Sequence, residues 1–244
     1  MPFTTTIRYP LSMRKASFLS ILLIILLTSC TVSEQITLNN KTNSKIESDI
    51  QVEDFFVTVI EDFASFLPTS DESLLDGGIK GFSNQLKSSS ATTAVSYSKP
   101  EENHYLIDVS FSSLPQLIND LSGGIDQSII KLDDNSFSFY VDINNYNELE
   151  QIVPFLADPN FETFLPQYNI GYTEEDYLDM IVFLLGEEAP EKIKESTIKI
   201  RLKTPSRITS YTNCKKINST TIEYEFELID FLLLATPLSF SVKW

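Results

Sequence analysis

Apolar and polar positions in the first third of the chain change from a strand pattern to a helix pattern. Apolar residues alternate with polar ones over 36–38 and again over 46–52, on either side of an asparagine-rich turn, and this predicts a β-hairpin. Over 52–67 the apolar residues recur at spacings of three and four, which predicts an amphipathic helix that Pro68 ends. A weaker helical pattern follows over 70–90, where glycines confine the prediction to the second half.

The middle of the chain alternates with a period of two, apart from one short helical pattern. Strands are expected around 93–98 and 105–111. Ser113 then has the properties of a helix N-cap, and the short helix it starts would end at a pair of glycines. Two further apolar runs flank an Asp-Asp-Asn turn at 133–135, which predicts a second hairpin.

Residues 145–195 have a different, helical pattern. Their longest apolar segment runs from Thr173 to Gly186, and Thr173 and Asp176 have the spacing of a capping box. Apolar side chains lie nearly all round this segment, so we expect the helix to be buried on more than one side. We interpret the whole block as a helical insertion into the fold.

Two strands near the C-terminus carry opposite charges on their polar faces. Lysine and arginine alternate with apolar residues over 198–203, and glutamates do so over 222–228. Antiparallel pairing with Arg201 opposite Glu225 would place each basic side chain next to an acidic one, which favours this register. The other pairs expected in this register are Lys199 with Glu227 and Lys203 with Glu223.

Strands with one polar and one apolar side are typical of antiparallel sheets that have one face in water. A last alternating strand covers 238–244, and helices have to cover the apolar face. The sequence therefore predicts an α+β fold: an antiparallel sheet with one solvated face and helices packed on the other, plus the helical insertion at about 145–195. We expect a single α+β domain over residues 45–244.

Residues 1–29 have the properties of a lipoprotein signal peptide. Basic residues precede the uncharged run FLSILLIILL at 18–27, which has the length of a signal-peptide core and is too short to span a membrane. The run ends in Leu27-Thr28-Ser29-Cys30, which resembles a bacterial lipobox. The resemblance implies cleavage before Cys30 and attachment of acyl chains to that cysteine. The alternative is an uncleaved signal-anchor helix with a chance cysteine at its end.

Charge and anchoring together predict how the mature protein meets the membrane. The whole chain has a net charge of −16, and removal of residues 1–29 takes away three basic and no acidic residues, which leaves −19. This excludes ordinary nucleic-acid binding, because phosphate neutralisation needs clustered Lys and Arg. Anionic headgroups repel such a body, so acyl chains on Cys30 would have to hold it at the membrane.

We interpret residues 30–44 as the lipidated cysteine, a tether and the start of the first hairpin. A tether joined to a repelled body predicts a domain that stands off the bilayer. The protein is then expected outside the cytoplasm, on the periplasmic side or outer surface of a bacterial membrane. Met13 directly precedes the basic pair of the signal peptide, so both Met1 and Met13 are candidate starts.

Candidate catalytic and metal-binding residues are few. The single histidine, His104, stands at the mouth of a predicted hairpin without a nucleophile in a recognisable context, and we interpret it as a solvated turn residue. Cys214 has no disulfide partner within the chain if Cys30 is lipidated, and we interpret it as a semi-buried thiol, with an intermolecular disulfide as the alternative. The acidic clusters lack the spacing of a calcium loop. We therefore expect no catalytic residue, no metal and no cofactor.

Aromatic residues are abundant on the predicted helices. They could line an apolar cavity between helices and sheet, suited to a lipid or another apolar ligand. The alternative is that the rings fill the core. The residues expected to line such a cavity are Phe55, Phe56, Phe63, Tyr177 and Phe183.

Four segments follow the lipobox cysteine in this order: ITLNNKTNSKIESDIQV, HYLIDVSFSSLPQLINDL, TIKIRLKTPSRITSYTN and TTIEYEFELIDFLLLATPLSFSVKW. Their order and patterns resemble the LppM-like family of bacterial lipoproteins. Pro205-Ser206 and Asn213-Cys214 stand where the family tends to have Pro-Gly and Asn-Gly. The resemblance implies an α+β extracytoplasmic domain, with lipid binding suggested for some members, and it supplies no catalytic residues.

Three functions remain open at the level of sequence. The first is a non-catalytic, membrane-anchored envelope module that binds or scaffolds a partner protein, and this is the reading we adopt. The second is a binder of lipid or of another apolar ligand, which requires a cavity between helices and sheet. The third is a hydrolase, which requires two carboxylates, or a serine and a base, that converge in a cleft.

Overall fold

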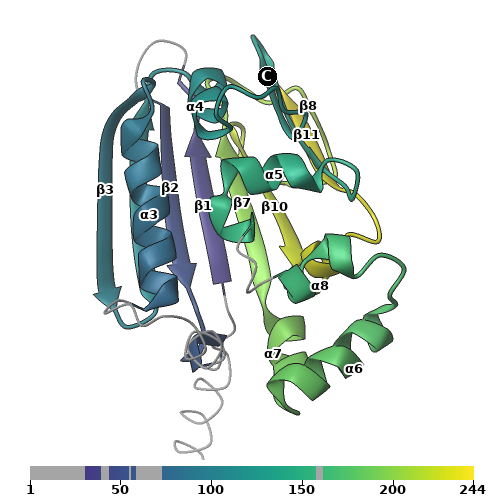
Figure 1. Cartoon of the computed structure of the whole chain (residues 1–244). Helices are drawn as coiled ribbons and strands as arrows, with labels where there is room; N and C mark the ends of the chain where they lie inside the picture. Colours follow the sequence, from purple (N-terminus) through teal and green to yellow (C-terminus); the bar gives the residue numbers. More distant parts are fainter. Residues whose placement is uncertain (1–30, 40–43, 55, 59–72, 158–161) are drawn as a thin grey trace, which may run out of the picture.

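The computed structural model describes residues 31–39, 44–54, 56–58, 73–157 and 162–244. These residues form two β-sheets with helices beside them (Figure 1). The fold is mixed α+β and its strands are mostly antiparallel, so the predicted fold class is confirmed.

The larger sheet has the strand order β3-β4-β2-β1-β7-β10-β9. Strands β1 and β2 form the predicted N-terminal hairpin, and β1 also pairs in parallel with β7. The other neighbours are antiparallel. Its strands are β1 (Thr31–Thr37), β2 (Ser44–Gln51), β3 (Thr92–Glu101), β4 (His104–Phe111), β7 (Thr197–Lys203), β9 (Lys215–Lys216) and β10 (Thr221–Glu227).

The smaller sheet has the strand order β5-β6-β11-β8 and is antiparallel throughout. The predicted hairpin with the Asp-Asp-Asn turn forms one half of it, and the last strand of the chain pairs with that hairpin. Its strands are β5 (Ile130–Asp133), β6 (Ser136–Val141), β8 (Ser210–Thr212) and β11 (Leu238–Lys243).

Helix α4 (Leu114–Leu121) begins and ends where local sequence signals predict. Ser113 caps this helix, since its hydroxyl accepts a hydrogen bond from the Gln116 N–H, and Gly123 and Gly124 follow the helix with positive φ. The helices are α3 (Leu74–Ser88), α4 (Leu114–Leu121), α5 (Tyr146–Ile152), α6 (Glu174–Leu185), α7 (Ala189–Glu195) and α8 (Leu228–Leu233). Short 3-10 turns cover Pro154–Ala157, Glu162–Phe164 and Pro166–Tyr168.

Helices cover one part of the larger sheet, and the smaller sheet covers another part. Helix α3 runs along β3 and β4, and α5 crosses in front of β7 and β10 (Figure 1). The smaller sheet covers the β10 side, where the rings of Tyr224 and Phe240 lie 5.0 Å apart between centroids. One apolar cluster joins residues of all these elements, among them Val109, Leu117 and Leu202. Burial of this surface is the main stabilising contribution to the fold.

Three predictions about the elements need correction. A single antiparallel sheet was expected, whereas the structure has two sheets and a parallel pair, because alternation identifies the faces of a strand but not its neighbours. Helix α3 includes the first half of its pattern, with Gly77 and Gly81 inside it. No residue separates Cys30 from β1, so the expected tether is replaced by a strand that begins at Thr31. The helix predicted over 52–67 lies largely outside the described residues.

The helical insertion forms a second apolar cluster beside the main core. Its capping box is confirmed: the Thr173 hydroxyl accepts from the Asp176 N–H, and the Asp176 carboxylate accepts from the Thr173 N–H. Tyr177 and Ile181 of α6 pack with residues of α7 and α8. The opposite side of α6 is exposed, so the prediction of burial on more than one side is wrong.

The charged strands pair as predicted, but in a register two residues away from the expected one. Arg201 lies opposite Glu223 and its Nε donates to the carboxylate at 2.7 Å, while Lys199 lies opposite Glu225 with Nζ 3.5 Å from Oε1. A shift of two keeps every side chain on its own face, so charge alternation alone does not separate the two registers. Buried pairing of Leu202 with Ile222 accompanies the observed register.

The observed register predicts which second substitution restores the stability that Arg201→Glu removes. Arg201→Glu places two carboxylates together and should lower the free energy of unfolding by about 1 kcal/mol. Arg201→Glu combined with Glu223→Arg should restore most of that loss in urea unfolding, whereas the combination with Glu225→Arg should not. Equal rescue by both partners would contradict the observed register.

One carboxyl group lies on the apolar face of the larger sheet. Glu34 of β1 shares a face with Ile36, and its carboxylate accepts a 2.6 Å hydrogen bond from the Ser48 hydroxyl on β2. Burial raises the pKa of Glu34 to about 7, while the Ser48 hydrogen bond acts in the opposite direction.

Glu34 should make the stability of the protein depend on pH. The folded state holds a proton that the unfolded chain releases from its ordinary pKa of 4.5 upward, so the free energy of unfolding falls as pH rises from about 4.5 through 7. We expect Glu34→Gln to remove this fall and to stabilise the protein at pH 8 by on the order of 1–3 kcal/mol. Denaturant unfolding from pH 4 to 9 measures it, with Glu47→Gln on the outer face as the control. An unchanged pH slope in Glu34→Gln would contradict the assignment.

Candidate functional site

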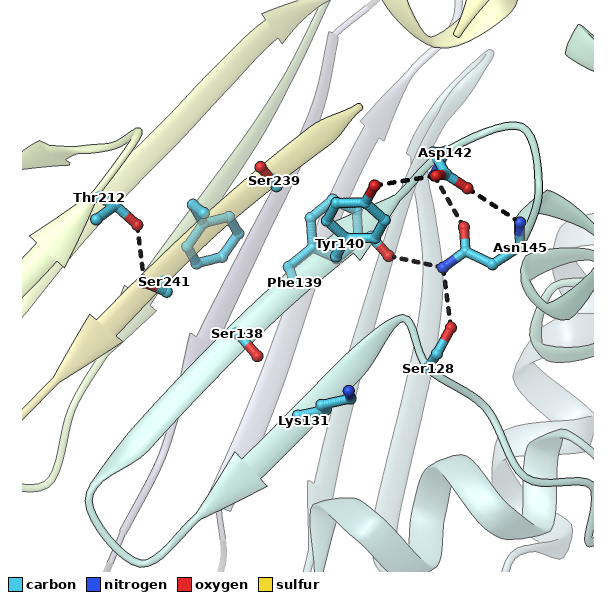
Figure 2. A pocket seen from close by; sticks show the side chains of 11 residues that line it. Ser128, Lys131, Ser138, Phe139, Tyr140, Asp142, Asn145, Thr212, Ser239 and Ser241 are labelled. Carbon is cyan, nitrogen blue, oxygen red and sulfur yellow. Dashed lines mark hydrogen bonds between the residues drawn. The ribbon is translucent and has the colours of Figure 1, made fainter. Parts of the chain in front are cut away.

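The outer face of the smaller sheet is hollowed into an open groove of about 550 Å³ (Figure 2). It lies over β5, β6, β11 and the end of β8, and its far end meets the turn before α5. The residues that line it are Ser128, Lys131, Ser138, Phe139, Tyr140, Asp142, Asn145, Thr212, Ser239, Phe240 and Ser241.

The groove follows from the alternation of large and small residues on these strands. On β6 and β11, phenylalanines point to the core while serines take the opposite face. Strand pairing aligns Lys131, Ser138, Ser241 and Thr212 in one row across all four strands, and we call this row the hydroxyl row. The short side chains of Ser138 and Ser241 at the centre of this row leave a hollow, and larger residues such as Lys131 and Tyr140 border it.

The hydroxyl row is ordered by its own hydrogen bonds. The hydroxyls of Thr212 and Ser241 are 2.8 Å apart (Figure 2), and the Asn213 amide donates to the Ser239 hydroxyl at 3.4 Å. Asn213 takes a left-handed conformation with φ 53°, which asparagine tolerates better than most residues. The turn after β8 therefore holds the groove's edge strand in place.

A polar network fixes the other end of the groove. The Asn145 amide donates to the Ser128 hydroxyl at 3.0 Å and to the Tyr140 carbonyl at 3.2 Å, and its side-chain oxygen accepts from the Asp142 N–H (Figure 2). The Tyr140 hydroxyl donates to the Asp142 carboxylate at 2.9 Å. Because Asn145 is buried, its bonds are well placed to hold Tyr140 and Asp142 at the rim.

The network also sets the charge of the rim. Burial acts to raise the pKa of Asp142, but hydrogen bonds from Tyr140, Asn144 and Asn145 outweigh it and lower the pKa. The same bond to Asp142 raises the pKa of the Tyr140 hydroxyl. At neutral pH the rim therefore carries a carboxylate beside a protonated phenol, with the Lys131 amine across the groove.

This arrangement suits binding by hydrogen bonds. Serine and threonine hydroxyls both donate and accept, Asp142 accepts, Lys131 donates, and Tyr140 adds an exposed aromatic ring. Among the described residues, no group of three or more His, Cys, Asp or Glu side chains is arranged to hold a metal ion. The groove thus presents an open surface of polar side chains with one well-exposed aromatic ring, that of Tyr140.

The residues predicted to line an apolar cavity are not brought together in this way. Tyr177 is 1% exposed, fills the second cluster and donates its hydroxyl to the Phe164 carbonyl at 3.2 Å. Phe56 packs against the same cluster, whereas Phe183 is 88% exposed and points into solvent. Tyr177 and Phe183 therefore do not face a common cavity, because they lie on different sides of α6, one buried and one exposed. Phe55 and Phe63 lie outside the described residues.

The remaining residues singled out from the sequence have varied positions. Leu27, Thr28, Ser29 and Cys30 lie outside the described residues, so lipidation stays a prediction. In the part of the chain that is described, no helix is long and apolar enough to cross a membrane.

The two other residues considered for a chemical role, His104 and Cys214, also have defined surroundings. The His104 Nε2 lies 2.9 Å from an oxygen of Asp49 on the neighbouring strand. Cys214 is a half-buried free thiol whose pKa burial raises, so it is less reactive than an exposed cysteine.

Sequence reasoning missed the groove, although its signal is present. The runs Ser136–Val141 and Leu238–Lys243 both alternate serine with large apolar residues. Such alternation predicts a polar face made of small side chains. Nothing in the sequence indicates that the two runs pair with each other, and the groove exists only because they do.

Comparisons with known proteins give a likeness in structure but none in sequence. No family model and no curated protein matches the chain. Among solved structures, the chain is similar to the NMR structure of the folded domain of LppM from Mycobacterium tuberculosis, with a TM-score of 0.38 and 13% identity, over 88% of this chain and 90% of that one.

Proposed function

We propose that this protein is a lipid-anchored, extracytoplasmic envelope protein that binds a polyhydroxyl ligand and does not catalyse a reaction. The hydroxyl row in the groove of the smaller sheet is the observation that carries the proposal. The ligand class that fits it is an oligosaccharide, because sugar hydroxyls donate and accept hydrogen bonds as the row does.

The groove has the features that sugar recognition needs. Its polar groups are held in place before a ligand arrives, since Asn145 orders the rim and Thr212 bonds Ser241, and this lowers the entropic cost of binding. Tyr140 is 42% exposed and offers a ring face for the apolar side of a sugar. The open shape fits a chain that lies across the four strands better than a small enclosed molecule.

The anchor would keep this groove at the cell envelope. The lipobox-like segment that ends at Cys30 supports acylation, and two or more acyl chains give stable membrane attachment where one does not. An anchored protein is concentrated near envelope glycans, so weak binding to each sugar unit suffices.

The anchor is tested by replacing Cys30. Cys30→Ala should abolish palmitate labelling and release the protein from the membrane fraction, because no acyl chain can be attached. Labelling and fractionation of cells that express each form measure both effects, with Cys214→Ala as the control that retains them. Unchanged membrane retention and labelling in Cys30→Ala would contradict the anchor.

The groove is tested by sugar binding to the mature protein in detergent. We expect an N-acetylglucosamine tetramer, or glycan strands released from cell wall, to bind in calorimetry. Tyr140→Ala should weaken that binding about tenfold, equivalent to about 1.4 kcal/mol. Tyr168→Ala is the matched control, because Tyr168 is also exposed but lies outside the groove. Absence of binding by both probes, or an equal loss in the two variants, would contradict the proposal.

A further inference from the structure

Helix α6 exposes three consecutive apolar side chains. Val182, Phe183 and Leu184 are all exposed, and Phe183 is 88% accessible. Successive helical residues are about 100° apart, so Phe183 points away from the side that is buried against α7 and α8. Val182 and Leu184, which are 38% and 37% exposed, border that buried side. Soluble monomers rarely leave apolar groups of this size together in water, and such patches mark contacts with a membrane or a partner.

The exposed face of α6 lies at the end of the fold where β1 begins. Helix α7 packs on α6 and leads through Ser196 directly into β7. The first residue of β7, Thr197, lies opposite Thr31, the first residue of β1, in the parallel pair. Figure 1 shows α6 and α7 at this same end of the larger sheet.

The proposed attachment residue, Cys30, is followed directly by the first residue of β1. Cys30 is bonded to Thr31, which is already paired with both Gln51 and Thr197. Consecutive Cα atoms are about 3.8 Å apart, so an acylated Cys30 holds the beginning of β1 at the membrane surface. The domain cannot drift away on a tether, and whatever surrounds the beginning of β1 is brought to the lipid.

We propose that Val182, Phe183 and Leu184 of α6 insert into the surface of the bilayer that holds the acyl chains of Cys30. This inference rests on the anchor in the proposed function and adds a second, apolar contact that orients the domain. The anchor supplies a high effective concentration of lipid, so a small apolar contact is enough to be occupied. The groove on the smaller sheet then has a defined orientation relative to the membrane.

The charges around the patch make the contact shallow and sensitive to lipid composition. Glu174, Glu175 and Asp176 lie in the first turn of α6, Asp179 lies one turn before Phe183 on the same side of the helix, and Glu187 and Glu188 follow the helix end. The Lys194 amine neutralises one of them through an ion pair with Glu174 at 2.9 Å. Because the remaining carboxylates are repelled by anionic headgroups, insertion should weaken as the fraction of anionic lipid increases.

A single tryptophan placed on α6 tests the contact. In a Trp244→Phe background, Phe183→Trp is compared with Ile217→Trp in lipidated, full-length mature protein reconstituted into phosphatidylcholine vesicles. Ile217 is the matched control because it is exposed at the other end of the sheet, where Thr221, Lys203 and Thr37 meet. We expect a blue-shifted emission and quenching by brominated lipid for Phe183→Trp only, with both effects reduced when phosphatidylglycerol is added.

The possible failures are distinguishable by vesicle flotation. If the protein floats with the vesicles and Phe183→Trp still emits as in water, the α6 contact is overturned while the anchor stands. If the protein does not float and carries no palmitate, the anchor is overturned and this inference with it. A blue shift of Phe183→Trp in detergent-free Cys30→Ala protein without vesicles would show that a second copy of the chain covers the patch, which also overturns the contact.

Discussion

The pairing of β1 on both of its edges is the constraint on which the rest of the structure depends. This strand joins the N-terminal hairpin to the C-terminal strands, because β2 pairs with one edge and β7 with the other over its whole length. Without that parallel pair the larger sheet would separate into two halves. The same pairing fixes the residue that follows Cys30, so sheet assembly would also determine which end of the domain faces the membrane under the proposed acylation of Cys30.

The helices and the smaller sheet both cover the larger sheet, but only the smaller sheet also carries the proposed binding groove. Helices α3 to α5 and the inner face of the smaller sheet bury one continuous apolar cluster. The smaller sheet has a second face in water, and the residues there are free to be short and polar without a loss of core packing. Phenylalanines on one side and serines on the other side of the same strands, such as Phe240 beside Ser239 and Ser241, serve these two roles at once.

Local sequence patterns predict most of the helices and strands, but they do not predict which strands lie next to one another in a sheet. The cap at Ser113 and the capping box at Thr173 depend on residues three positions away, so the sequence alone predicts them. The separation of β11 into a second sheet, the parallel β1–β7 pair and the two-residue register shift of Arg201 all depend on contacts between distant segments. The groove was missed for the same reason, and Phe183 was misplaced because apolarity alone does not tell which side of a helix is covered.

Hydrogen exchange of the β1 amides in the lipidated, membrane-bound protein tests this account most directly. If β1 is a central strand that begins at the anchor, the paired amides within Val32 to Ile36 should exchange as slowly as those of β7, which open only when the whole sheet unfolds. Rapid exchange across this segment, at the rate of an unstructured chain, would mean that a flexible tether follows Cys30. That result would contradict both the fixed orientation of the domain and the central position of β1.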